Sequence, residues 1–149
     1  MIPGRDWIAT RIEEAAFACR SAGAQLTPLR RDVLALILGM EGPVSAYQLL
    51  DRLRETRPGA VPPTVYRALN FLLAHRLIHK VESLNAYVSC TQAVPHAQSA
   101  QFLICSKCGT VAEVEDESVS AALRQAAERH GFRATGAVVE VSGLCPACS

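Results

Sequence analysis

The chain has 149 residues, which is enough for one ordinary domain or two small ones with a buried core. Half of the residues are hydrophobic and 19% are charged, a composition that excludes a disordered tail, a collagen-like fibre and a coiled coil. The longest apolar run, Val33 to Met40, is eight residues and too short to span a membrane, so we expect a cytoplasmic protein without a membrane partner.

The formal net charge of +1 divides unevenly along the chain. Residues 1–83 carry 11 Lys and Arg against 8 Asp and Glu, a net charge of +3, whereas residues 84–149 carry 4 against 6, a net charge of −2. A mildly basic first half weakly favours a polyanionic partner for that half.

Four helices are predicted in the first half. Apolar residues recur every three or four positions up to Ala22, and Gly23 is a natural C-terminal cap. Thr27 and Ser45 are good N-caps for the second and third helices, and Pro62 begins a fourth that extends to about His75.

A β-hairpin is predicted next, because residues 77–83 and 86–90 alternate like strands around the turn Leu84-Asn85. Short helices followed by a hairpin are the order of a winged helix-turn-helix. We therefore predict a winged-helix DNA-binding domain over residues 1–84 and a hinge over residues 85–92.

The second half predicts a small α/β domain over residues 93–149, so the fold class is α+β. Strands are expected at residues 101–104, 110–115 and 137–141, and an amphipathic helix at 116–130. The helix positions expected to face inward are Val119, Leu123, Ala126 and Ala127.

Two Cys-x-x-Cys pairs are the strongest chemical signal. They are Cys105/Cys108 and Cys145/Cys148. Each pair lets one tight turn supply two thiolates to a tetrahedral zinc ion, and Gly109 permits the positive φ that such a turn often needs. The alternative is two redox dithiols, but pairs of that type sit at helix starts, and both pairs here lie at strand ends.

Two cysteines remain outside the pairs. Cys19 lies on the inner stripe of the first helix and is expected to be a core residue. Cys90 is the basis of a second, weaker metal hypothesis. Cys90 lies near His79, His96 and Glu113 in the predicted order of elements, and such a set is acceptable to zinc. Each residue by itself is more simply explained as a strand-end histidine or a solvated glutamate.

The fourth helix has a small polar face opposite its apolar one. Arg67 is central to the polar face, with Thr64 and Asn70 beside it and Tyr66 to the side. An Arg in that position fits the major groove, where it can pair with guanine, although a solvated surface Arg is an equal alternative. Phe71 also falls outward, with no role assigned by the sequence.

Several motifs together resemble the ferric uptake regulator family. They are Leu26-Thr27-Pro28-Leu29-Arg30, Pro62-Pro63-Thr64-Val65-Tyr66-Arg67-Ala68-Leu69 and the two Cys-x-x-Cys pairs. Ser45-Ala46-Tyr47-Gln48-Leu49-Leu50 and His79-Lys80-Val81-Glu82-Ser83 are similar to the zinc uptake regulator (Zur) branch. The resemblance implies a homodimer that binds double-stranded operator DNA and holds two zinc ions per chain.

The resemblance also implies residue roles. The structural zinc ligands would be Cys105, Cys108, Cys145 and Cys148, and the regulatory zinc ligands His79, Cys90, His96 and Glu113. Tyr47 and Arg67 match base-contacting positions, and Asp51 and Arg54 match positions that pair between neighbouring dimers.

The expected function is therefore a zinc-responsive repressor of zinc uptake genes. One departure argues against iron sensing: residues 95–101 hold a single histidine, His96, where iron-sensing members usually carry a cluster. The alternatives are an iron- or peroxide-sensing relative, or a zinc-stapled adaptor for protein interactions. An enzyme with a small-molecule substrate is not expected, because no nucleophile–base pair or phosphate loop is visible.

Overall fold

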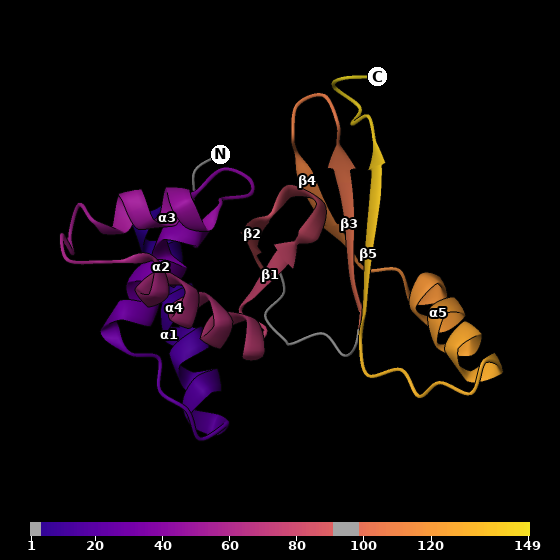
Figure 1. The fold of residues 1–149 in the computed structure, drawn as a ribbon, viewed down its shortest axis with the longest axis horizontal. Helices are drawn as coiled ribbons and strands as arrows, with labels where there is room; N and C mark the ends of the chain where they lie inside the picture. Colours follow the sequence, from indigo (N-terminus) through magenta and orange to yellow (C-terminus); the bar gives the residue numbers. More distant parts are fainter. Residues whose placement is uncertain (1–3, 91–98) are drawn as a thin grey trace. The chain divides into compact units, whose positions relative to one another are not determined.

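The computed structural model describes residues 4–90 and 99–149. The chain divides into two compact units, residues 1–93 and 94–149, which are described separately (Figure 1). The first is mainly helical and the second is built on a sheet, which confirms the α+β class. None of the helices in the described part of the chain combines the length and the hydropathy that a membrane span requires.

Helix α1 (Arg5–Ser21) ends as its sequence predicts. Gly23 has a φ of +76°, and the N–H of Ala24 donates to the carbonyl of Cys19 at 2.8 Å. This is the hydrogen-bond pattern that closes a helix on a left-handed glycine. Cys19 itself is 1% exposed, so the prediction of a core cysteine is confirmed.

Helices α2 (Pro28–Gly39), α3 (Ala46–Leu53) and α4 (Pro62–Ala74) begin where their caps predict. The hydroxyl of Thr27 accepts from the N–H of Arg30 at 3.4 Å, and the hydroxyl of Ser45 accepts from the N–H of Gln48 at 3.1 Å. The Gln48 side chain in turn accepts from the N–H of Ser45 at 2.9 Å, which completes a capping box.

The core of the first unit is formed by the facing sides of these helices. Its most buried members on α2, α3 and α4 are Val33, Leu49, Leu53, Val65, Leu69 and Leu72. Phe71 packs at the edge of this core, with the guanidinium of Arg30 3.7 Å from its ring centre. This cation–π contact explains an aromatic side chain that helical periodicity alone places outward.

The predicted hairpin is present but shorter than its pattern. Strand β1 (Ile78–Val81) pairs antiparallel with β2 (Ala86–Ser89). Strand β2 lies within the segment 85–92 that the sequence assigns to a hinge. A single 3₁₀ turn, η1 (Glu82–Leu84), and Asn85 with a φ of 47° join the strands. Because asparagine tolerates the left-handed region, it can close this connection without glycine.

The second unit has a three-stranded sheet in the order β4-β3-β5. Strand β3 (Ser99–Cys105) lies in the centre, antiparallel to β4 (Val111–Val114) and parallel to β5 (Ala137–Gly143) (Figure 1). Helix α5 (Glu117–Arg129) connects the outer strands. The three predicted strands and the helix are therefore confirmed, with shifted ends.

The side chains of α5 are less buried than the predicted inward packing requires. Within the described chain no residue of α5 is buried, and Leu123 remains 37% exposed. The helix instead contacts β3 through polar groups: Gln101 donates to the Ser120 hydroxyl at 3.1 Å, and Ser99 and Ser120 share a 2.6 Å hydrogen bond. Periodicity identifies an apolar stripe but not whether this chain alone covers it.

Candidate metal centres and nucleic-acid interface

Four cysteines converge at one end of the sheet in the second unit. The sulfur atoms of Cys105, Cys108, Cys145 and Cys148 all lie within 4.8 Å of one another. All six cysteines of the chain lie among the described residues and are free of disulfides. The predicted pairing of the two Cys-x-x-Cys motifs into a single cluster is therefore supported by the geometry.

Each pair lies on a tight turn. The N–H of Gly109 donates to the carbonyl of Cys105 at 2.9 Å, and the N–H of Cys148 donates to the carbonyl of Cys145 at 2.9 Å. Gly109 has a φ of +76°, as its position after the first pair predicts. The N–H of Ser149 also donates to the carbonyl of Cys145 at 3.0 Å, the same four-residue span as the Gly109 bond, so two similar turns present two thiol groups each.

The parallel pairing of β3 and β5 brings these turns together. Cys105 at the end of β3 is the register partner of Gly143 at the end of β5, two residues before Cys145. The N–H of Ser106 donates to the carbonyl of Gly143 at 2.9 Å, just beyond the strands. Strand order, rather than the spacing of the motifs, determines that the two turns meet.

The cluster fits a tetrahedral zinc ion. Four thiolates at about 2.3 Å from zinc are separated from one another by about 3.8 Å. The sulfur atoms of Cys108 and Cys145 lie 3.8 Å apart. The donor set and its spacing therefore suit structural zinc, and a Cys₄ site has no open position for a catalytic water.

Hydrogen bonds within the cluster shift the pKa values of its thiols. The pKa of the Cys105 thiol is lowered to about 6, chiefly because the backbone N–H of Cys108 donates to its sulfur. The hydroxyl of Thr110, 3.1 Å from the sulfur, lowers the pKa of Cys108. Hydrogen bonding with Cys145 raises the pKa of Cys148 to about 12. The lowered pKa of Cys105 favours its thiolate, which is the metal-binding form of cysteine.

Two further side chains of the kinds that bind zinc, a histidine and a cysteine, lie in the first unit. His79 is on β1 and Cys90 directly follows β2, and a ring nitrogen of His79 lies within 4.8 Å of the Cys90 sulfur. Cys90 is 5% exposed, and its N–H donates to the carbonyl of Leu77 at 3.2 Å. Of the other two predicted ligands, Glu113 lies on β4 of the second unit and His96 lies outside the described residues.

Helix α4 presents the polar face that the sequence predicts. Arg67 and Asn70 are exposed, Tyr66 is 49% exposed and Thr64 is half-buried. Tyr47, at the start of α3, is 75% exposed. These side chains are available to a partner, whereas the opposite face of α4 is buried in the core.

The two residues expected to pair between dimers lie on and directly after α3. Asp51 and Arg54 are both exposed. The Nε of Arg54 donates to the carbonyl of Ala60 at 3.0 Å, so its side chain also holds the loop before α4.

Sequence reasoning missed Arg11 on α1. Its guanidinium donates from Nη2 to the carbonyl of Cys90 at 3.1 Å, across 79 positions of the chain. Neither a motif nor a spacing signals such a contact, because a backbone carbonyl accepts from any donor that the fold brings to it.

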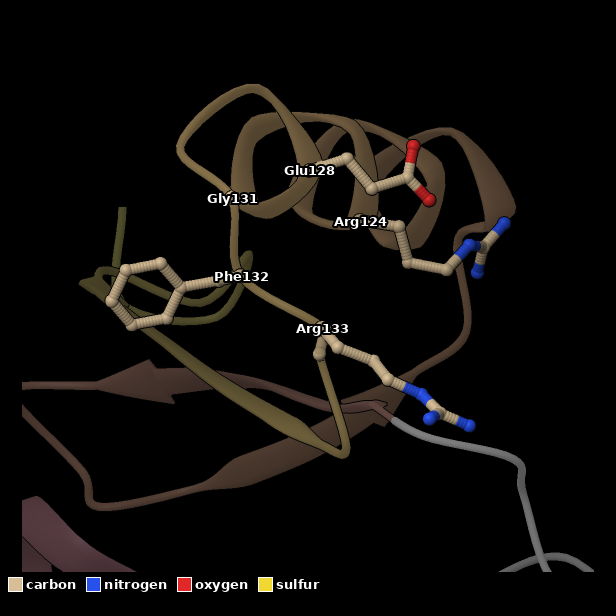
Figure 2. Close-up of a pocket in the computed structure, with 6 residues that line it drawn as sticks. Arg124, Glu128, Gly131, Phe132 and Arg133 are labelled. Atoms are coloured by element: carbon tan, nitrogen blue, oxygen red, sulfur yellow. The ribbon is translucent and has the colours of Figure 1, made fainter.

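A pocket of about 310 Å³ lies at the end of α5 and includes none of the four clustered cysteines in its lining. Figure 2 shows Arg124 and Glu128 projecting from the helix, with Phe132 and Arg133 on the chain that follows. Arg124 is paired with Glu117 at 2.7 Å. The lining carries two arginines, Arg124 and Arg133, against one glutamate, Glu128, and the pairing with Glu117 offsets one of the positive charges.

Comparison with known proteins gives consistent matches along nearly the whole chain. Residues 21–142 match the model of the ferric uptake regulator family. The zinc uptake regulation protein of Escherichia coli K12 is 43% identical over 137 residues, which cover 92% of this chain and 80% of that protein.

Solved structures agree with the sequence matches. A zinc uptake regulator complexed with zinc and DNA has a TM-score of 0.89 at 41% identity, covering 94% of this chain and 93% of that one. Holo XcZur has a TM-score of 0.84 at 43% identity, covering 91% of this chain and 94% of that one.

Proposed function

Since this chain belongs to the ferric uptake regulator family, we propose that it is a zinc-responsive transcriptional repressor of zinc uptake genes that acts in the cytoplasm. The observation that carries the proposal is the likeness to a zinc uptake regulator holding both zinc and DNA, because it extends over nearly all of this chain. The winged helix supplies the DNA-binding part, and the four-cysteine cluster supplies one metal site.

We assign operator recognition to α4 and the start of α3. A recognition helix enters the major groove with one polar face, which on α4 contains Arg67 and Asn70. Arg67 would pair with a guanine, while Tyr47, Thr64 and Tyr66 would contact neighbouring bases or phosphates. Asp51 of one dimer would pair with Arg54 of the next where two dimers share an operator.

Arg67→Ala is expected to weaken specific operator binding by about 1–3 kcal/mol and to change binding to random DNA little, because a base contact carries sequence information. Binding of both DNAs would be measured at one fixed salt concentration. Arg129→Ala, an exposed arginine at the end of α5, is the matched control for charge and should leave both affinities unchanged. Equal losses on the two DNAs would instead make Arg67 a phosphate contact.

We assign the structural zinc to the four-cysteine cluster and a second, regulatory zinc to His79, Cys90, His96 and Glu113. The thiolate of Cys90 makes this set softer than sites rich in histidine and carboxylate alone, which favours zinc over iron. Its ligands come from different segments of the chain, so metal affinity depends on how those segments are arranged. Only such a difference in affinity between arrangements shifts DNA binding.

The second unit is assigned to homodimer formation. Leu103 and Val141 are register partners on β3 and β5, and they remain 46% and 51% exposed. With Leu144 they line an apolar pocket of about 260 Å³. Exposed apolar surface of this kind marks an interaction site, and a second copy of the chain would cover it.

Fluorescence anisotropy of a labelled palindromic AT-rich operator tests the proposed function. We expect binding to appear as buffered free Zn²⁺ rises, while about one zinc per chain resists mild chelation. The same titration with Fe²⁺ distinguishes an iron-sensing relative. Binding without any dependence on added metal would remove the regulatory claim, and absence of salt-sensitive operator binding would favour a protein-interaction adaptor.

A further inference from the structure

We propose that Arg11 is a positioning residue for the metal ligand Cys90 and thereby makes helix α1 part of the zinc response. The proposal rests on the proposed regulatory site, of which Cys90 is the thiolate ligand. It concerns contacts made entirely within the first unit.

The Cys90 backbone is held on both sides. Its N–H donates to the carbonyl of Leu77 at 3.2 Å, next to β1. Its carbonyl accepts from Nη2 of Arg11 at 3.1 Å. Since β2 ends at Ser89, the strand pairing itself does not extend to this carbonyl. Arg11 therefore restrains the peptide plane that follows Cys90.

Arg11 is itself oriented by its own helix. Its Nη1 donates to Glu14 at 3.2 Å, one turn further along α1, and its guanidinium lies 5.9 Å from the centre of the Trp7 ring. The Arg11 side chain is only 19% exposed, whereas that of Glu14 is 54% exposed. A guanidinium with few alternative positions is a more effective restraint than a freely solvated one.

The consequence for metal binding follows from the covalent geometry of the ligand. The direction of the Cys90 side chain depends on the backbone on either side of its Cα atom. The Cys90 sulfur lies within 4.8 Å of a His79 ring nitrogen. A sulfur and a ring nitrogen that bind the same tetrahedral zinc ion are about 3.6 Å apart. Hydrogen bonds that orient ligating side chains directly typically change metal affinity by about 10–100-fold, and a bond to the ligand's own backbone acts on the same orientation from one step further away.

The test is a Co²⁺ titration of protein whose four-cysteine cluster already holds zinc. Arg11→Met keeps an unbranched stem, shorter than that of arginine, and removes every N–H donor of the guanidinium, including those to Glu14 and Cys90. We expect it to weaken Co²⁺ binding at the second site by about 10–100-fold and to change the thiolate-to-cobalt charge-transfer band. Arg11→Lys, which retains a donor, should recover part of both. Arg20→Met, an exposed arginine on the same helix, is the matched control.

The outcomes distinguish the role of Arg11 from the proposed regulatory zinc site on which it rests. Wild-type affinity and an unaltered band in Arg11→Met would overturn the role of Arg11 and leave the regulatory site intact. A Cys90→Ser protein that keeps the charge-transfer band would overturn the regulatory site itself. Should Arg11→Met not fold, Arg11→Lys is decisive, because one nitrogen cannot reproduce the separate bonds of Nη1 to Glu14 and Nη2 to Cys90, and a band and affinity identical to wild type in that variant would overturn the proposal.

Discussion

Cys105→Ser is expected to remove the structural zinc and with it the folded, dimeric second unit. The substitution deletes a buried thiol of the four-cysteine cluster, the one whose pKa is lowered to about 6. Structural zinc sites contribute about 10–16 kcal/mol to folding at neutral pH, more than the total stability of most domains. Zinc content, sedimentation and circular dichroism of the purified variant measure the three losses.

The location of the cluster explains why the loss should spread. The turns that carry the cysteines are joined to the ends of β3 and β5, and Ser106 bonds to Gly143 between them. Helix α5 adds polar hydrogen bonds to β3 but no buried side chain among the described residues, so it does not replace the link that the cluster makes between β3 and β5. Cys19→Ala, a buried cysteine outside the cluster, is the control and should keep full zinc and the dimer. A folded, dimeric Cys105→Ser protein would contradict the structural assignment.

Cys90→Ser is expected to abolish zinc-dependent operator binding while leaving both units folded. Serine keeps the size of the side chain and the backbone bonds to Leu77 and Arg11, but it does not supply a thiolate to zinc. If the metal changes operator affinity 100-fold, the coupling lost is about 2.7 kcal/mol. Anisotropy titrations with buffered Zn²⁺, run beside circular dichroism, measure the two properties separately.

The same experiment can contradict the regulatory site. The Cys90→Ser protein should still retain one zinc per chain, since the four-cysteine cluster is intact. Operator binding with the zinc dependence of the wild-type chain would show that Cys90 is not a sensing ligand. Cys19→Ala again serves as the control, because it removes a thiol from the same unit without touching either ligand set.

Much of the first unit is predictable because its signals are local. Thr27, Ser45 and Gly23 mark helix ends through bonds that span at most five positions, and the structure shows those bonds. The turn at Cys105–Gly109 is local in the same way. The length of the hairpin was less predictable, since an alternating pattern does not distinguish a strand from the 3₁₀ turn at Glu82–Leu84.

The features of the candidate sites likewise divide into local ones and ones that depend on packing. The helices of the first unit, the thiol-bearing turns and the polar face of α4 follow from local signals, because caps, periodicity and short spacings act over a few residues. The meeting of the two turns depends on the fold, since β5 pairs parallel to β3 across more than thirty residues. It likewise placed Arg30 against Phe71 and Arg11 on Cys90. Such contacts depend on how elements pack, and packing depends on shape and burial summed over many side chains, which no short motif records.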